Sequence, residues 1–158
     1  MYEFHYDYML QKYGENAQLM YTDTDSLVYY IKTADFYRDI ALDVKDRFDT
    51  SNYDVEDNRP LPIGINKKVP GMFKDENSGK IMREFITLRA KMYAFKMLDA
   101  KVEKRCKGTK KAVVKKHLSF EDYKKCLNTG KIQYRIQHKI TSEKHRVYTE
   151  RVKKNRTE

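Results

Sequence analysis

Apolar residues recur at helical and strand periods along the first third of the chain. The spacing of Phe and Tyr residues predicts a helix over 1–13. Apolar runs over 17–21 and 27–31, with a short polar segment between them, predict two strands joined by a turn. Thr33 is expected to cap a second helix whose apolar stripe ends at Phe48. Its aspartates are expected to form a solvated face: Asp35, Asp39, Asp43 and Asp46.

The middle of the chain alternates between loop signals and strand signals. Polar residues, prolines and glycines predict loops over 49–71. Strands are expected over 72–76 and 81–97, joined by the hairpin turn Asn77-Ser78-Gly79-Lys80. A basic connection is expected over 99–111.

The sequence of the last third of the chain predicts two short helices and a long hairpin. One helix is expected over 111–118, and a second should begin after the N-cap Ser119 and end at Gly130. Alternating residues over 132–152 predict a hairpin that turns near Ser142. Together, these helices and antiparallel hairpins predict an α+β fold.

Length and composition limit the class of protein. The chain has 158 residues, enough for one domain or two small lobes, and 40% of them are apolar. Its apolar runs are too short for a membrane span, and residues 1–14 lack the features of a signal peptide. Cys106 and Cys126 lack metal-ligand spacing and are expected to be reduced thiols. We therefore expect an intracellular protein without a membrane partner.

The net charge of +10 is distributed unevenly. Residues 1–66 contain six Lys/Arg against thirteen Asp/Glu, a balance of −7. Residues 67–158 contain 27 Lys/Arg against ten Asp/Glu, a balance of +17. A basic half favours binding to a polyanion such as nucleic acid, although a charged solvated surface is the simpler alternative.

The turn between the first two strands holds the most specific chemistry. Asp23 and Asp25 are separated by Thr24 and followed by Ser26. Two carboxylates at one hairpin end can attract one or two Mg²⁺ ions, which prefer oxygen ligands. Two such ions can stabilise the attacking and leaving oxygens of a phosphoryl transfer. The alternative is a pair of ordinary turn acids, because aspartate is common in turns.

Two basic groups follow. On a continuous strand, Arg89, Lys91 and Tyr93 would project from one face and contact a phosphate backbone, or that face would simply be solvated. A basic loop and helix around Gly108 would close on a duplex or serve as a solubilising surface. The cations of this second group are Lys101, Lys104, Arg105, Lys107, Lys110, Lys111, Lys115 and Lys116.

These residues resemble a known family. The stretch Tyr21-Thr22-Asp23-Thr24-Asp25-Ser26-Leu27 resembles the palm motif, called motif C, of family B DNA polymerases. Leu88-Arg89-Ala90-Lys91-Met92-Tyr93 resembles the K-x-Y motif that follows it. The segment Lys107-Gly108-Thr109-Lys110-Lys111 is most similar to the protein-primed branch found in adenovirus-like viruses, linear plasmids and self-replicating transposons.

The resemblance implies a role for each matching residue. Asp25 would ligate the two catalytic Mg²⁺ ions, and Asp23 would support the site or bind metal more loosely. Lys91 and Tyr93 would hold the primer strand near its 3′ end. The implied partners are primer–template DNA, deoxynucleoside triphosphates and a terminal priming protein.

The resemblance also implies two parts of an enzyme. Residues 1–98 would form the C-terminal part of the palm, an antiparallel sheet packed by helices. Residues 99–158 would form a small mixed α/β thumb that grips the product duplex, with Lys107, Lys110 and Lys111 among its DNA contacts. A family B palm needs a further aspartate strand and a fingers helix, so the chain is expected to be a fragment that cannot extend a primer alone.

Two other functions remain open. The chain can be a non-catalytic DNA-binding relic of a transposon polymerase, which would bind duplex DNA without needing magnesium. It can also be a different metal-dependent phosphotransferase, such as a small nuclease or cyclase. That second alternative requires a third acidic ligand, for which Glu84 is the candidate.

Overall fold

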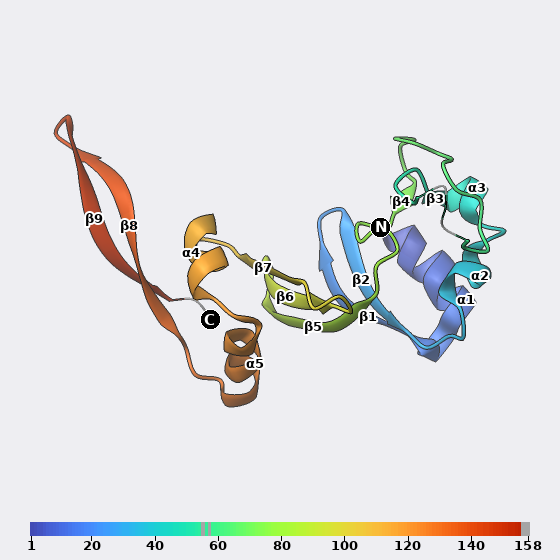
Figure 1. Ribbon diagram of the computed structural model, residues 1–158, viewed down its shortest axis with the longest axis horizontal. Helices are drawn as coiled ribbons and strands as arrows, with labels where there is room; N and C mark the ends of the chain where they lie inside the picture. Colours follow the sequence, from blue (N-terminus) through green and yellow to red (C-terminus); the bar gives the residue numbers. More distant parts are fainter. Residues whose placement is uncertain (55, 57, 156–158) are drawn as a thin grey trace. The chain divides into compact units, whose positions relative to one another are not determined.

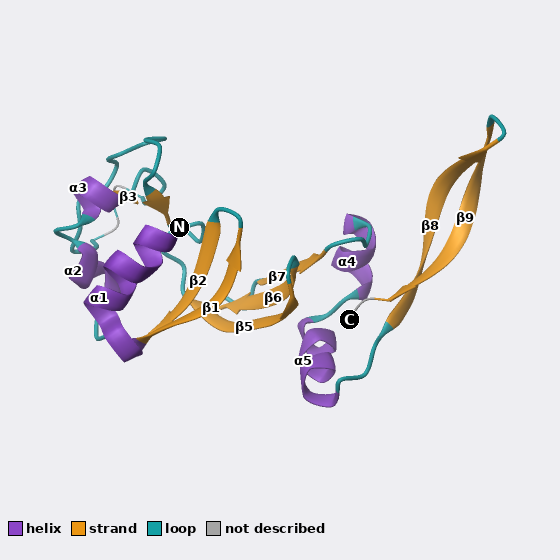
Figure 2. Ribbon diagram, turned by 180° about the vertical axis from the view of Figure 1, so that it is seen from behind, coloured by secondary structure: helices purple, strands orange, loops and turns teal. Residues whose placement is uncertain are grey.

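The computed structural model describes residues 1–54, 56 and 58–155, and it confirms the α+β class (Figures 1 and 2). The chain divides into two compact units, Met1–Ile81 and Met82–Glu158. The division into palm and thumb at residue 98 stays a prediction. No helix among the described residues has the length and apolar character needed to cross a bilayer.

Unit 1 begins with the expected helix and hairpin. The first turns are π-helical, the helix continues as α1, and Gly14 ends it with a positive φ of 53°. Met9 is almost fully buried, as are Phe4 and Tyr8, which the spacing predicted. The strands β1 and β2 pair antiparallel, with a bulge after Leu19. The elements are η1 (Phe4–Met9), α1 (Leu10–Tyr13), η2 (Gly14–Asn16), β1 (Ala17–Asp23) and β2 (Ser26–Ile31).

The second predicted helix is two short helices, α2 (Phe36–Ile40) and α3 (Val44–Arg47). Its expected cap was wrong, because Asp35 accepts hydrogen bonds from the backbone of Tyr37 and Arg38, whereas the Thr33 hydroxyl donates to Asp39. The apolar stripe was correct. It buries Ile40, Val44 and Phe48 against the first helix in the core of unit 1.

Two further acids in this region carry structural contacts. The Asp43 carboxylate, expected to be solvated, accepts hydrogen bonds from the Tyr8 hydroxyl and from Lys12. Asp49 is only 6% exposed and accepts from two backbone amides and the Lys74 ammonium. It ends β3 (Phe48–Asp49), which pairs parallel with β4 (Phe73–Lys74).

The predicted strand pairing in the middle of the chain was wrong. Residues 77–80 do form a turn, and Asp75 accepts from the amides of Asn77 and Gly79. However, β4 pairs with β3, so this turn joins no hairpin. The run over 81–97 is itself a hairpin that reverses at Ala90–Lys91.

Unit 2 consists of a three-stranded antiparallel sheet, two helices and a second hairpin (Figure 1). The basic connection expected over 99–111 contains the third strand of that sheet. The sheet strands are β5 (Met82–Arg89), β6 (Met92–Met97) and β7 (Val102–Cys106). The helices are α4 (Lys111–His117) and α5 (Phe120–Thr129). The hairpin strands are β8 (Tyr134–Glu143) and β9 (Arg146–Asn155).

Local signals in unit 2 were confirmed. Ser119 forms a capping box with Asp122, and Gly130 ends α5 in the left-handed conformation. Residues from both helices pack against one face of the sheet, where Met92 and Ala94 are buried with Tyr123. The second hairpin turns at Lys144–His145, two residues beyond the predicted position.

Candidate functional site

The aspartate turn is the end of the β1–β2 hairpin, as the sequence predicts. Asp23 is the last residue of β1 and pairs with Ser26, the first of β2. Thr24 adopts a positive φ of 42°, which allows the chain to reverse in two residues. Its hydroxyl donates to the Asp23 carboxylate at 3.2 Å, and the Ser26 hydroxyl donates to the Asp23 carbonyl at 3.2 Å.

The donor set of this turn fits part of a magnesium site. Asp25 is exposed and Asp23 is partly buried, so the hairpin presents two carboxylates to incoming ligands. Mg²⁺ usually binds through one or two carboxylates, several waters and substrate phosphates. Among the residues that the structure describes, no group of three acids, histidines or cysteines is arranged to hold a metal. The two aspartates would therefore need the oxygens of a nucleotide or of another acid.

The expected common strand face of Arg89, Lys91 and Tyr93 was wrong. Arg89 ends β5, Lys91 lies in the turn with a φ of 59°, and Tyr93 lies in β6 opposite Thr87. The sequence does not indicate this turn, because Ala90 and Lys91 are not typical turn residues. Arg89 and Lys91 therefore lie at the tip of a hairpin.

The structure brings the two basic groups together at one end of the sheet. The β5–β6 turn lies beside the segment that follows β7, and the Lys107 amide donates to the Lys91 carbonyl at 3.0 Å. The exposed cations of this end, here called the basic end, are Arg89, Lys91, Lys107, Lys110 and Lys111. Neighbouring cations of this kind suit a phosphate backbone.

Two members of the basic segment have other roles than expected. The Lys104 ammonium donates to the carbonyls of Leu118 and Lys115, so it caps the end of α4. Arg105 lies opposite Tyr93 in the β6–β7 ladder and is exposed. The sequence predicts a basic connection over 99–111 and no strand there, so it does not reveal that Arg105 is a neighbour of Tyr93.

Glu84 does not behave as a spare metal ligand. Its carboxylate lies 3.4 Å from the Lys96 ammonium and 3.6 Å from that of Lys124. Desolvation raises the pKa of Glu84, but the hydrogen bonds and charges of these two lysines outweigh it and hold the pKa below its usual value. The carboxylate is thus already neutralised by cations of its own unit.

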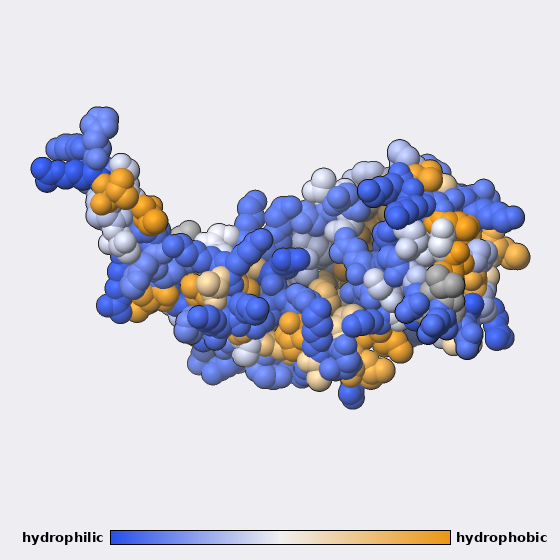
Figure 3. Space-filling model, turned by 45° about the horizontal axis from the view of Figure 1, so that its top comes forward, coloured by the Kyte–Doolittle hydropathy of each residue, from blue (hydrophilic) through white to orange (hydrophobic). Residues whose placement is uncertain are grey.

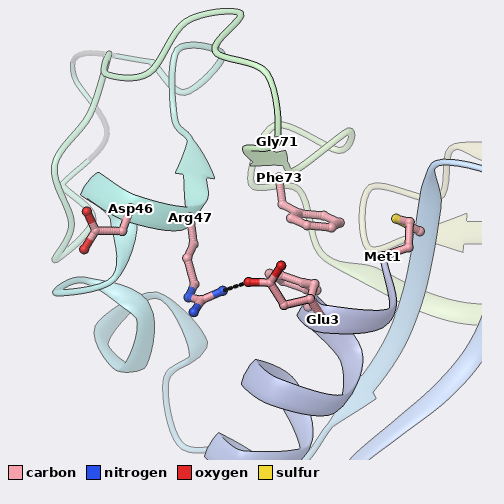
Figure 4. A pocket seen from close by; sticks show the side chains of 7 residues that line it. Met1, Glu3, Asp46, Arg47, Gly71 and Phe73 are labelled. Atoms are coloured by element: carbon pink, nitrogen blue, oxygen red, sulfur yellow. Dashed lines mark ion pairs between the residues drawn. The ribbon is translucent and has the colours of Figure 1, made fainter.

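A small pocket in unit 1 lies away from the residues that the sequence singled out. Glu3 and Arg47 point toward one another at its mouth and form an ion pair of 3.9 Å (Figure 4). Phe73 stacks on Phe4 beside it, with ring centroids 3.7 Å apart. The pocket thus combines an apolar wall with two charged side chains that already form an ion pair with each other.

No family model, no curated protein and no solved structure matches this chain.

Proposed function

We propose that this chain forms part of a family B DNA-directed DNA polymerase, most similar to the protein-primed branch. It would contribute part of the metal site together with a grip on the primer and the duplex. The observation that carries the proposal is the two-residue turn that ends the β1–β2 hairpin with Asp23 and Asp25. This is the local geometry that the resemblance to motif C leads us to expect.

In this proposal, Asp25 and Asp23 would hold magnesium at the hairpin end. Bound magnesium would activate the primer 3′ hydroxyl and stabilise the pyrophosphate leaving group. The chain's own residues would mainly position the DNA. Lys91 and the neighbouring cations would neutralise phosphates, and Tyr93 would contact the primer strand.

Its partners would be primer–template DNA, deoxynucleoside triphosphates and, in the protein-primed branch, a terminal priming protein. The charge of the second unit supports the first of these. Residues 82–158 contain 23 Lys/Arg against eight Asp/Glu, a balance of +15. A surplus of this size favours a polyanionic partner.

The metal site is tested by Mn²⁺ binding, followed by electron paramagnetic resonance in the presence of primer–template DNA and a deoxynucleoside triphosphate. Asp25→Asn should strongly reduce Mn²⁺ binding because it removes a carboxylate ligand. Asp7→Asn is the matched control, since Asp7 is an exposed acid on the first helix of the same unit. Equal Mn²⁺ binding by the two variants would contradict the proposed metal site.

A second function, a non-catalytic DNA-binding module, is favoured by one observation. The basic end lies in one unit, whereas the described residues contain no complete metal-binding cluster. This module would bind duplex DNA with the same affinity in magnesium and in a chelator. A magnesium-dependent affinity that Asp25→Asn abolishes would reject it in favour of the polymerase.

A further inference from the structure

The hairpin formed by β8 and β9 has two chemically different faces. Its ten cross-strand pairs run from Tyr134–Asn155 to Glu143–Arg146, and directly paired residues share a face. We call the face that contains Ile140 the outer face and the face that contains Gln137 the inner face. Apolar residues appear among charged ones on this hairpin in Figure 3, at the left end of the view.

The inner face anchors the hairpin to the helices of unit 2. Gln137 is buried, and its side-chain oxygen accepts a hydrogen bond from the Lys110 amide at 3.2 Å. Arg135 donates to the His117 carbonyl and lies 3.5 Å from the Asp122 carboxylate. The base of the hairpin is therefore joined to the basic end through Lys110.

The outer face exposes apolar side chains. Ile140 is 74% exposed and Val147 is 71% exposed, and the two are diagonal neighbours near the turn. Nearer the base, Ile136 is 48% exposed and Tyr134 is 43% exposed. Because exposed aliphatic surface is unfavourable in water, this face is suited to a partner that offers an apolar surface.

Cations lie among these apolar residues on the same face. These cations are Arg151, which lies opposite His138, and Lys153, which lies opposite Ile136. The Lys153 ammonium lies 4.8 Å from the Tyr134 ring centre. A partner that fits must therefore be anionic and must also offer apolar surface. Duplex DNA combines a phosphate backbone with stacked bases.

The length of the hairpin suits a duplex, and its aliphatic side chains favour the minor groove. Each strand has ten residues, which at a strand rise of about 3.4 Å spans roughly one helical turn of duplex DNA. Near the turn, the outer face carries the aliphatic Ile140 and Val147 with the hydroxyls of Ser142 and Thr149. Arg151 lies next to Thr149 on the same face, and arginine side chains enter the minor groove as well as the major groove. Aliphatic side chains act as wedges between base steps from the minor groove.

We propose that the outer face of the β8–β9 hairpin enters the minor groove of duplex DNA and that Ile140 and Val147 unstack a base step there. The proposal rests on duplex DNA being the partner of the proposed function. It adds a specific contact with bases to the phosphate contacts of the basic end. The bound duplex would be kinked at the step where the wedge enters.

The test uses the full chain and duplexes that carry 2-aminopurine at successive positions, whose fluorescence increases when the base is unstacked. The double variant Ile140→Thr/Val147→Thr keeps β-branched side chains that suit a strand, but it places a hydroxyl where each side chain has an apolar group. It should lose the fluorescence increase and weaken duplex affinity several-fold. The salt dependence of binding should stay unchanged, because the cations remain.

Tyr148→Thr is the matched control, since Tyr148 is an exposed aromatic residue on the inner face near the same turn. It should bind DNA and raise 2-aminopurine fluorescence as the unmodified chain does. Far-ultraviolet circular dichroism checks that both variants fold. Equal losses in the two variants would overturn the proposal, because the effect would not belong to the outer face.

Two other outcomes separate this inference from the proposed function. Salt-dependent duplex binding without a fluorescence increase would overturn the wedge and leave the DNA-binding function intact. Absence of any duplex binding would overturn both. A further experiment measures binding of the chain to vesicles of phosphatidylserine and phosphatidylcholine. Binding to these vesicles that the double variant loses, together with unchanged 2-aminopurine fluorescence, would overturn the proposal in favour of a lipid surface.

Discussion

At the scale of single residues, Asp49 shows how unit 1 stabilises a buried charge. The Asp49 carboxylate is almost completely buried, and its partners are Ser51 after β3, the Lys68 amide in the loop before β4 and Lys74 at the end of β4. Burial raises the pKa of Asp49, but hydrogen bonds from Ser51, the Lys68 amide and the Lys74 ammonium outweigh this effect and hold the pKa far below its usual range. The ionised form therefore stabilises the folded state.

The Asp49→Asn variant should lower the free energy of unfolding by about 2 kcal/mol at neutral pH, because an amide accepts these bonds less well than a carboxylate. The folded-state pKa is depressed, so this stabilisation is complete above the unfolded value of about 3.9 and decreases as pH falls below it. Urea unfolding of both proteins at several pH values measures the difference. A difference that does not shrink in acid would contradict the role assigned to Asp49.

Lys91 combines a strained backbone with a charge at the basic end. Its φ of 59° is unfavourable for lysine and better tolerated by asparagine. Lys91→Asn should leave stability unchanged or raise it by up to about 1 kcal/mol, while the slope of log affinity against log salt decreases in magnitude by about 1.

Lys101→Asn is the control for this variant, because Lys101 lies at the opposite end of the same sheet and is exposed. It should leave the salt slope for duplex binding almost unchanged. Thermal unfolding and fluorescence anisotropy provide the two measurements. A loss of both stability and affinity in Lys91→Asn alone would indicate a structural rather than a DNA-binding role.

At the scale of elements, the ends of helices and hairpins depend on a few local contacts. At the start of α5, the Ser119 hydroxyl accepts a hydrogen bond from the Asp122 amide, and the Asp122 carboxylate accepts one from the Ser119 amide. The helix then places Tyr123 against the β5–β6–β7 sheet, where the Tyr123 hydroxyl donates to the Arg105 carbonyl. The cap therefore supports the strand that carries Arg105.

Ser119→Ala should lower the free energy of unfolding by about 1 kcal/mol, because a backbone donor at the start of α5 loses its partner. Urea denaturation followed by circular dichroism measures this change. Ser142→Ala, near the exposed tip of β8, serves as the control and should have little effect. Equal destabilisation by both changes would argue against the capping box as the cause.

At the scale of the whole molecule, charge is divided between the two units. Unit 1 contains ten Lys/Arg against fifteen Asp/Glu, a balance of −5, and unit 2 has a balance of +15. Long-range electrostatics therefore direct a polyanion toward unit 2. The acidic unit, which contains the aspartate turn, is the one suited to attract cations.

Replacing Lys107, Lys110 and Lys111 together by glutamine should reduce the magnitude of the salt slope by about 3, because roughly one counterion is released for each phosphate contact. The control replaces three exposed lysines of unit 1, Lys45, Lys67 and Lys68, and should change the slope much less. Anisotropy titrations at several salt concentrations give both slopes. Equal changes would indicate that duplex binding is spread over the whole surface.

The sequence by itself determined the features that depend on neighbours along the chain. The α+β class, the β1–β2 hairpin, the capping box and the long C-terminal hairpin follow from local periods, turn residues and caps. The position of Asp23 and Asp25 at a hairpin end belongs to this group, because the polar turn lies directly between two apolar runs.

The tertiary structure decided the features that depend on pairing between distant segments. The parallel pair β3–β4, the reversal at Ala90–Lys91 and the strand β7 were all missed. A long run of strand-forming residues does not reveal where it folds back, because the stabilisation comes from packing on helices that follow later in the chain. For the same reason only the fold brings Lys91 beside Lys107 and makes one basic end from two separate stretches of sequence.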